Sequence, residues 1–126
     1  CSNNCSIVLK LTGRGPRGFS YLITGDTEIA RWETIHKLFG SALKSHVLAA
    51  PHHGSKNATH PASLLKIAPH TVLISAGVDN QFDHPSPQAV KVYKKVAKYV
   101  FSTNMEGGVS LLTRPGATEL TTTLVR

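Results

Sequence analysis

Residues 46–55 read HVLAAPHHGS, a short apolar run that leads into a proline and two adjacent histidines. The first five residues have the length and composition of a buried strand, and the Pro and Gly that follow predict an irregular loop. The same order recurs at 71–87, where a second apolar run leads into the polar loop GVDNQFDHPSP. Loops that follow neighbouring strands can bring side chains together at one sheet edge. The sequence therefore predicts an α/β domain with a polar site at such an edge.

The flanking segments predict further alternation of strands and helices. Residues 5–12 and 18–24 are β-rich and are separated by GRGPR, a pattern typical of an antiparallel hairpin. Apolar residues at helical spacing predict an amphipathic helix over 26–39, ended by Gly40. The remaining predicted elements are helices over 62–68 and 87–97 and strands near 98–102, 108–113 and 118–124.

Length and composition indicate one domain over residues 1–126. The chain has 126 residues and is 40% hydrophobic, which is enough for a core of its own. Because it contains no apolar run of roughly 18 residues, we expect a soluble segment that makes no membrane contact itself. The net charge of +7 favours nucleic acid and other polyanions as partners, although a solvated basic surface without a partner explains it equally well.

Asp26 follows the second predicted strand and precedes a predicted helix. An aspartate in that position can accept hydrogen bonds from the first free amides of the helix, as an N-cap does. A carboxylate at the end of a buried strand can equally serve as a metal ligand. The sequence leaves both interpretations open.

The histidines of the two loops are further candidates. His52 and His53 precede a glycine, and imidazole suits metals such as zinc and manganese. Neighbouring side chains on extended backbone point to opposite sides, so one would bind metal while the other supported it or contacted substrate. Two exposed loop histidines are the alternative interpretation. His84 lies between Asp83 and Pro85, where a restricted loop could hold a general acid or a phosphate-contacting group.

Four motifs, in this order and spacing, closely resemble the ComEC-type branch of the metallo-β-lactamase superfamily. They are Asn3-Asn4-Cys5-Ser6, Thr24-Gly25-Asp26, His52-His53-Gly54-Ser55 and His84-Pro85, and the late Glu106-Gly107-Gly108-Val109 resembles the closing hairpin of the family. The resemblance implies an αββα sandwich built from two similar halves. Residues 1–126 resemble the second, C-terminal half.

The resemblance also implies a site with two divalent metal ions, zinc or manganese, in the complete domain. Asp26 resembles the carboxylate that bridges the metals, and the pair His52 and His53 resembles the source of the last histidine ligand. We favour His53 because superfamily members commonly present this ligand directly before a glycine. His84 resembles a catalytic histidine beside the site. Supporting roles are expected for Asn4, Ser6 and Ser55.

The first-half motif of the superfamily, a His-x-[His/Asp]-x-Asp-His cluster, does not occur in the sequence. Asp26 and one histidine give two protein ligands, fewer than the three usual for a catalytic zinc. The chain is therefore expected to need an N-terminal half, supplied by the same protein or by a second chain, and to be inactive alone. The apolar face that would meet that half is expected to be exposed or paired in an oligomer.

The function implied by the resemblance is metal-dependent hydrolysis, with the complete domain acting as a phosphodiesterase or nuclease on DNA during competence-related DNA uptake. A ComEC-like parent would carry this soluble domain on the extracytoplasmic side of a membrane. Two alternatives remain open at this stage. The chain could be a non-catalytic module for nucleic-acid binding or assembly, or a metallo-hydrolase acting on another substrate.

Overall fold

The structure is a computed structural model that describes residues 2–14 and 18–123. Cys1 and most of the predicted GRGPR turn lie outside these residues. The elements are η1 (Asn3–Cys5), β1 (Leu9–Thr12), β2 (Ser20–Ile23), α1 (Ile29–Phe39), η2 (Gly40–Leu43), β3 (Val47–Ala49), η3 (Pro51–Gly54), η4 (Lys56–Ala58), α2 (Pro61–Ile67), β4 (Thr71–Ile74), α3 (Pro87–Val96), β5 (Tyr99–Ser102), α4 (Thr103–Glu106), β6 (Gly108–Arg114) and β7 (Ala117–Thr123).

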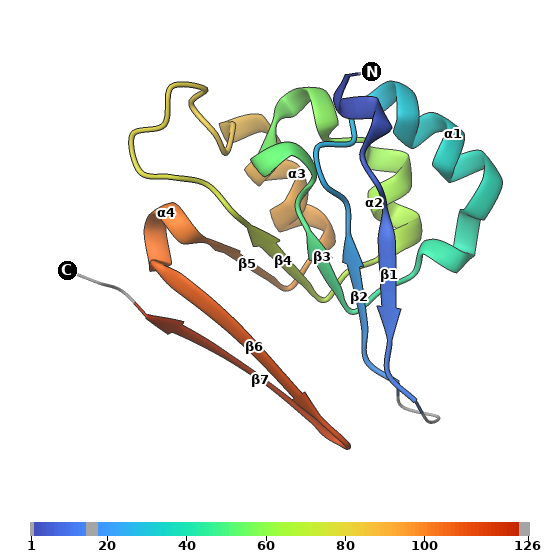
Figure 1. The fold of residues 1–126 in the computed structure, drawn as a ribbon, viewed down its shortest axis with the longest axis vertical. Helices are drawn as coiled ribbons and strands as arrows, with labels where there is room; N and C mark the ends of the chain where they lie inside the picture. Colours follow the sequence, from blue (N-terminus) through green and yellow to red (C-terminus); the bar gives the residue numbers. More distant parts are fainter. Residues whose placement is uncertain (1, 15–17, 124–126) are drawn as a thin grey trace.

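Five strands form one mixed sheet in the order β1-β2-β3-β4-β5. Strands β2, β3, β4 and β5 run parallel to one another, whereas β1, at the edge of the sheet, runs antiparallel to β2. Strands β6 and β7 form a separate antiparallel hairpin. The fold is therefore α/β, as the sequence predicts, with a mixed five-stranded sheet, flanking helices and a β-hairpin (Figure 1).

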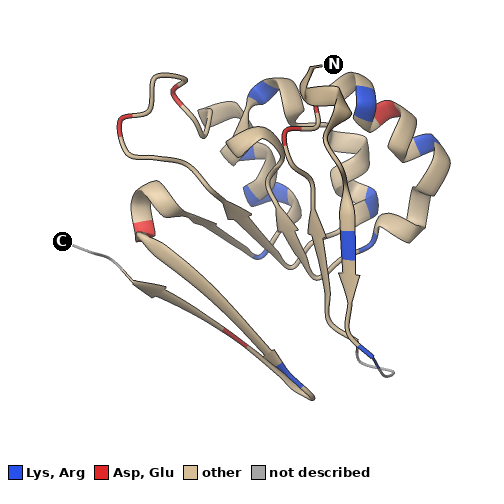
Figure 2. Cartoon of the chain, in the orientation of Figure 1, with Lys and Arg blue, Asp and Glu red and all other residues tan. Residues whose placement is uncertain are grey.

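Helices α1, α2 and α3 cover one face of the sheet, and the core lies between them and the strands (Figure 1). Leu22, Leu48 and Val72 stand side by side in the strand register and are at most 2% exposed. Trp32 of α1 and Tyr93 of α3 close over the same layer and are equally buried. The Lys and Arg residues of these helices, blue in Figure 2, are all exposed. The helices thus bury one sheet face and leave their charged side to water.

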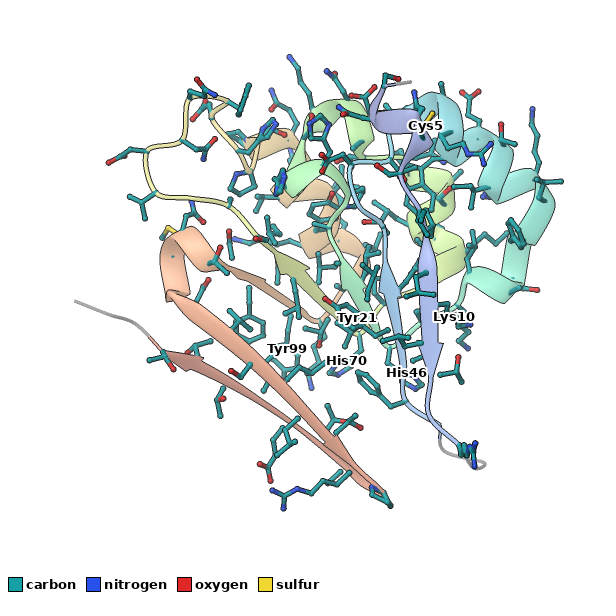
Figure 3. All side chains as sticks on the ribbon, viewed as in Figure 1. Cys5, Lys10, Tyr21, His46, His70 and Tyr99 are labelled. Carbon is teal, nitrogen blue, oxygen red and sulfur yellow. The ribbon has the colours of Figure 1, made fainter. Side chains whose placement is uncertain are left out.

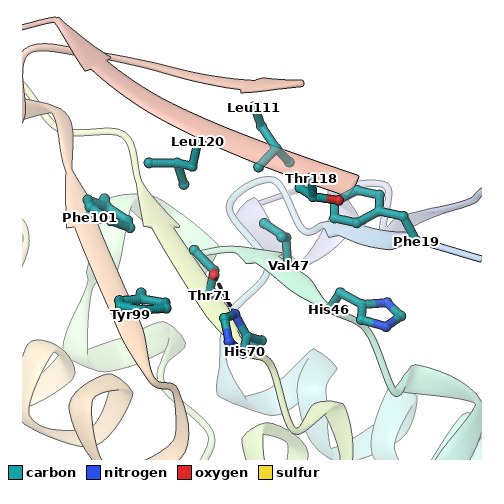
Figure 4. Close-up of a pocket in the computed structure, with 10 residues that line it drawn as sticks. All are labelled: Phe19, His46, Val47, His70, Thr71, Tyr99, Phe101, Leu111, Thr118 and Leu120. Atoms are coloured by element: carbon teal, nitrogen blue, oxygen red, sulfur yellow. Dashed lines mark hydrogen bonds between the residues drawn. The ribbon is translucent and has the colours of Figure 1, made fainter. Parts of the chain in front are cut away.

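The opposite face of the sheet is only partly covered. The β6–β7 hairpin lies across it (Figures 1 and 4), and a pocket of about 340 Å³ remains between hairpin and sheet. His46 and His70 line this pocket together with Tyr99 (Figures 3 and 4). Leu9 and Leu11 of the edge strand, on this same face, are 48% and 50% exposed. We refer to this surface as the open face.

The structure corrects several predicted boundaries. The first strand begins at Leu9 rather than at residue 5, because Asn3–Cys5 form a turn of 3-10 helix. Helix α1 begins at Ile29 rather than at residue 26, and Glu28 occupies the N-cap position. The interpretation of Asp26 as the N-cap is therefore wrong. The short helix α4 was not predicted from the sequence. Within the described residues, no helix has the length and apolar character needed to cross a bilayer.

Candidate functional site

The candidate residues lie where strands β2, β3 and β4 end. Asp26 comes three residues after β2, and His52 and His53 follow β3 after a two-residue spacer. His84 belongs to the loop that links β4 to α3. Because these strands are parallel neighbours, their carboxyl ends meet at one edge of the sheet, which is where α/β proteins commonly bind ligands. The structure therefore brings the predicted residues together.

A hydrogen-bonded turn holds Asp26. The hydroxyl of Thr24, which is fully buried, donates to the carbonyl oxygen of Ala49 at 2.8 Å and so ties the turn to strand β3. The hydroxyl of Thr27 donates back to the carbonyl oxygen of Thr24 at 2.7 Å. The amide of Asp26 donates to the hydroxyl of Ser6 at 3.1 Å, which anchors the N-terminal segment on the same turn. The Asp26 side chain remains partly exposed at the sheet edge.

His52 and His53 lie on a turn of left-handed backbone, which we call the histidine turn. Their φ angles are 48° and 55°, and Gly54 follows with a φ of 79°. Left-handed conformations cost non-glycine residues roughly 1–2 kcal/mol each, and such strain is concentrated at functional sites. Extended backbone was expected at these two histidines from the sequence, and that expectation is wrong. The turn places the two rings 6.2 Å apart, with their planes at 66°.

The pair formed by His53 and Asp26 is the central geometric feature of the site. Nδ1 of His53 lies 2.8 Å from the carbonyl oxygen of Ser75. Since a carbonyl only accepts, Nδ1 carries the hydrogen, and Nε2 of the neutral ring then has a free lone pair. This Nε2 lies 3.5 Å from Oδ1 of Asp26. Two electron-pair donors that face each other at this distance need a proton or a metal ion between them.

His52 has a different environment. Its Nδ1 lies 3.4 Å from Oε1 of Glu28, and its Nε2 lies 3.5 Å from the amide nitrogen of the Asn3 side chain. Asn3 also donates to the same carboxylate oxygen of Glu28 at 3.1 Å. The two ring nitrogens of His52 thus face Glu28 and Asn3. Neither Asn3 nor Glu28 was predicted as a site residue, although Asn3 begins the first motif and Glu28 lies two residues after Asp26.

His84 packs against the histidine turn. Its ring centroid lies 5.6 Å from that of His52 and 6.0 Å from that of Phe82. Burial lowers the pKa of His84 below its ordinary value of 6.5, and the charges of His52 and His53 lower it further, while Asp83 opposes them. The neutral imidazole is therefore its main form at neutral pH. Nδ1 of His84 is buried and has no hydrogen-bond partner among the described residues.

Backbone contact locks the His84 loop to the histidine turn. A Cβ on Gly54 would lie 2.7 Å from Cβ of Pro85, so a side chain there would push the two loops apart. The amide of Ser86 donates to the carbonyl oxygen of Gly54 at 3.0 Å. Asn80 stabilises the loop, because its side chain donates to the carbonyl oxygen of His84 and accepts from the amide of His84. The absence of a side chain at Gly54 thus allows the two loops to pack closely.

The predicted supporting residues hold backbone rather than line the site. Oδ1 of Asn4 accepts from the amide of Glu28 at 3.1 Å, just as Ser6 accepts from the amide of Asp26. The hydroxyl of Ser55 accepts from the amide of Asn57 at 3.2 Å, which begins helix η4. Their part in function stays a prediction. These hydrogen bonds from side chains to backbone amides hold the loops of the site in place.

The residues fit part of a metal site. Ligand atoms on one tetrahedral zinc, each about 2.0–2.1 Å from the metal, lie about 3.3–3.4 Å apart, close to the distance between His53 and Asp26. A ligand histidine typically donates its other ring nitrogen to a carbonyl or carboxylate, as His53 does to Ser75. No group of three or more His, Cys, Asp or Glu side chains suited to a metal occurs in residues 2–14 and 18–123. His53 and Asp26 are thus two candidate ligands, fewer than the three protein ligands usual for a catalytic zinc.

Comparison with known proteins gives one informative relative. The chain is 32% identical over 108 residues to "ComE operon protein 3" of Bacillus subtilis (strain 168), a match that covers 85% of the chain and 13% of that protein. No protein-family model matches the chain, and no solved structure matches it either. The chain is thus distantly related to this competence protein, ComEC, and spans about an eighth of its length.

Proposed function

We propose that the chain forms one half of a metal-dependent phosphodiesterase that acts on DNA in competence-related uptake, with Asp26 and His53 as its metal ligands. The observation that carries this proposal is the contact between Nε2 of His53 and the Asp26 carboxylate at 3.5 Å, with the other ring nitrogen held by a carbonyl. The relative adds support, because its name places it in the ComE operon. When bound, divalent zinc or manganese would activate water and neutralise phosphate charge.

The remaining side chains would position the substrate. The neutral ring of His84 carries one N–H donor, which suits a hydrogen bond to a phosphate oxygen better than a proton transfer at neutral pH. His52, held by Glu28 and Asn3, would support the turn that presents His53. The Asp26 carboxylate would hold the cation at the sheet edge.

The proposal includes a second half that covers the open face and completes the ligand set. Leu9 and Leu11 on that face are about half exposed, and an exposed apolar surface of this kind marks a binding interface. In the superfamily arrangement that the sequence resembles, the first half of the sandwich occupies this position. The same protein or a second chain could supply it.

Metal binding and cleavage test the proposal directly. Metal content is measured by elemental analysis and cleavage with a linear DNA plus manganese or zinc, first on the chain alone and then with the other half present. With that half present, Asp26→Asn and His53→Gln should weaken metal binding by more than the roughly 10–100-fold typical of an outer-shell partner. His36→Gln, in the last turn of α1 and away from the open face, is the matched control and should bind metal normally.

Three results would overturn parts of this proposal. Two tightly bound metal ions on the chain alone, with cleavage that depends on Asp26, would show that no second half is needed. Unchanged metal binding in both His53→Gln and Asp26→Asn would remove the ligand assignment. If His52→Gln alone abolished binding, the adjacent histidine would be the ligand instead.

A non-catalytic nucleic-acid module is the second candidate. The net charge of +7 and the incomplete ligand set both favour it. DNA binding that weakens with salt, persists in Asp26→Asn and occurs without turnover in the complete domain would support this function over hydrolysis.

A further inference from the structure

A lysine-lined groove begins beside the candidate site. It lies between α3 and the segment formed by β5 and α4, and has a volume of about 760 Å³. Pro85 and Ile74 line it, and the same two residues contact the position that a Cβ on Gly54 would take. The groove and the histidine turn therefore share a wall. A chain-like ligand bound in one would extend toward the other.

The groove is strongly basic on its helical side. Lys91, Lys94 and Lys95 line it, all three are exposed, and α3 contains no acidic residue (Figure 2). Spacings of three and four residues place these lysines on neighbouring positions of one helix surface. The lining includes one carboxylate, Glu106, whose Oε2 accepts from the backbone amide of Ser102 at 2.6 Å. Positive charge therefore dominates the groove.

The rest of the lining suits the sugar and base parts of a nucleic-acid strand. Val90, Val100 and Met105 give apolar wall, and Asn104 adds polar groups. In the loop that leads to Pro85, Phe82 is 68% exposed and stacks on His84 with ring planes at 27°. Proteins that bind single strands combine a basic groove with exposed aromatic rings on which bases stack.

We propose that this groove binds the phosphodiester backbone of a single nucleic-acid strand that runs past the candidate site. Lys91, Lys94 and Lys95 contact its phosphates, and Phe82 offers a stacking surface at the end nearest His84. An anionic membrane is a poorer match, because a bilayer reaches flat or convex surfaces and these lysines line a groove. The inference deepens the proposed function and rests on it for the direction of the strand toward the metal ligands.

The test measures binding of a fluorescent single-stranded 20-mer of thymidylate by anisotropy, with EDTA present so that metal plays no part. Lys91→Gln, Lys94→Gln and Lys95→Gln are combined and compared with Lys37→Gln, Lys44→Gln and Lys66→Gln, which remove the same charge from exposed positions outside the groove. The groove variant should lose about tenfold or more in affinity at 50 mM salt. Its slope of log K against log salt should shrink by about two, as expected for three lost phosphate contacts.

The outcomes separate this inference from the metal proposal. Equal losses in the two triple variants, or none in either, would overturn the groove assignment. Lysine-dependent binding to anionic phospholipid vesicles without lysine-dependent binding to the 20-mer would overturn it in favour of a membrane. If the groove variant loses DNA affinity while metal binding to Asp26 and His53 fails its own test, the groove stands and the catalytic proposal falls.

Discussion

The two faces of the five-stranded sheet are built from alternate residues of the same strands, yet they differ in how far their cover extends. On the helix side, Leu48 and Val72 are fully buried beneath α1, α2 and α3. On the open face, Val47 and Thr71 of the central strands are also buried, whereas Leu11 and Tyr99 of the outer strands are 50% and 43% exposed. Since a sheet with two apolar faces needs a cover on each, the exposed outer-strand residues indicate that the open face is covered only in part.

The β6–β7 hairpin is a weak cover for the open face. It is a separate two-stranded sheet, and a two-stranded hairpin is marginally stable on its own. Leu111 and Leu120 point into the pocket between hairpin and sheet, whereas Leu112 is 48% exposed (Figure 4). The hairpin therefore contributes a partial second layer. This supports the proposal that additional chain completes it.

Matched leucine truncations on the two faces test the contrast and should give the largest difference. Leu48→Ala removes a fully buried side chain and should lower the free energy of unfolding by about 3–5 kcal/mol. Leu11→Ala removes a half-exposed one and should cost less than about 1 kcal/mol. Urea unfolding of the isolated chain measures both. Comparable losses would show that the open face is already sealed, for example by self-association.

The sequence predicts most of the fold because each strand or helix buries one side, and this burial leaves a periodic pattern of apolar residues. The runs at 46–50 and 71–76 lie on β3 and β4, and the helical spacing at 87–97 matches α3 closely. The strand-then-loop pattern also identifies the sheet edge at which Asp26 and His53 meet. Local pattern thus locates both the layers and the site.

The missed features depend on contacts between distant residues. The late start of α1 follows from side-chain bonds, because Asn4 and Ser6 accept amide hydrogens of the Asp26 turn and hold it out of the helix. The left-handed backbone at His52 and His53 is stabilised by a bond from the His52 amide to the carbonyl of Gly25. Local propensity disfavours both, so the sequence alone could not indicate them.

Gly54 lies between the core residue Ile74 and the His84 loop. Its substitution should have the next largest effect on the free energy of unfolding. A Cβ there would lie 2.7 Å from Pro85 and 3.3 Å from the core residue Ile74, on backbone with φ of 79°. Strain and overpacking together should cost Gly54→Ala about 2–4 kcal/mol. Gly77→Ala, where the nearest atom is Asn80 Cβ at 3.9 Å, should change unfolding by less than about 0.5 kcal/mol. Similar losses would mean that the contact with Pro85 is not tight.

A smaller, pH-dependent effect on stability is expected in the helices that cover the sheet face opposite the open face. Nδ1 of His60 caps α2 by accepting from the amide of Ser63 at 3.3 Å, which requires that this nitrogen be unprotonated. Burial lowers the pKa of His60 below its ordinary value of 6.5, and the charge of His36 lowers it further, while Glu33 opposes them. The folded chain therefore binds fewer protons than the unfolded chain at pH values just below 6.5.

The sign of this effect follows from the depressed pKa. The stability due to neutral His60 is fully present above pH 6.5 and is lost as pH falls through the folded-state value, by up to about 1 kcal/mol for one cap. His60→Asn keeps a good N-cap acceptor and cannot titrate, so its stability should fall less between pH 7.5 and 5.5. Urea unfolding at several pH values compares the two chains, and His84, whose pKa is also lowered, contributes equally to both. Parallel stability curves would show that protonation of His60 leaves the cap intact, and the helical layer would then keep its stability across this range.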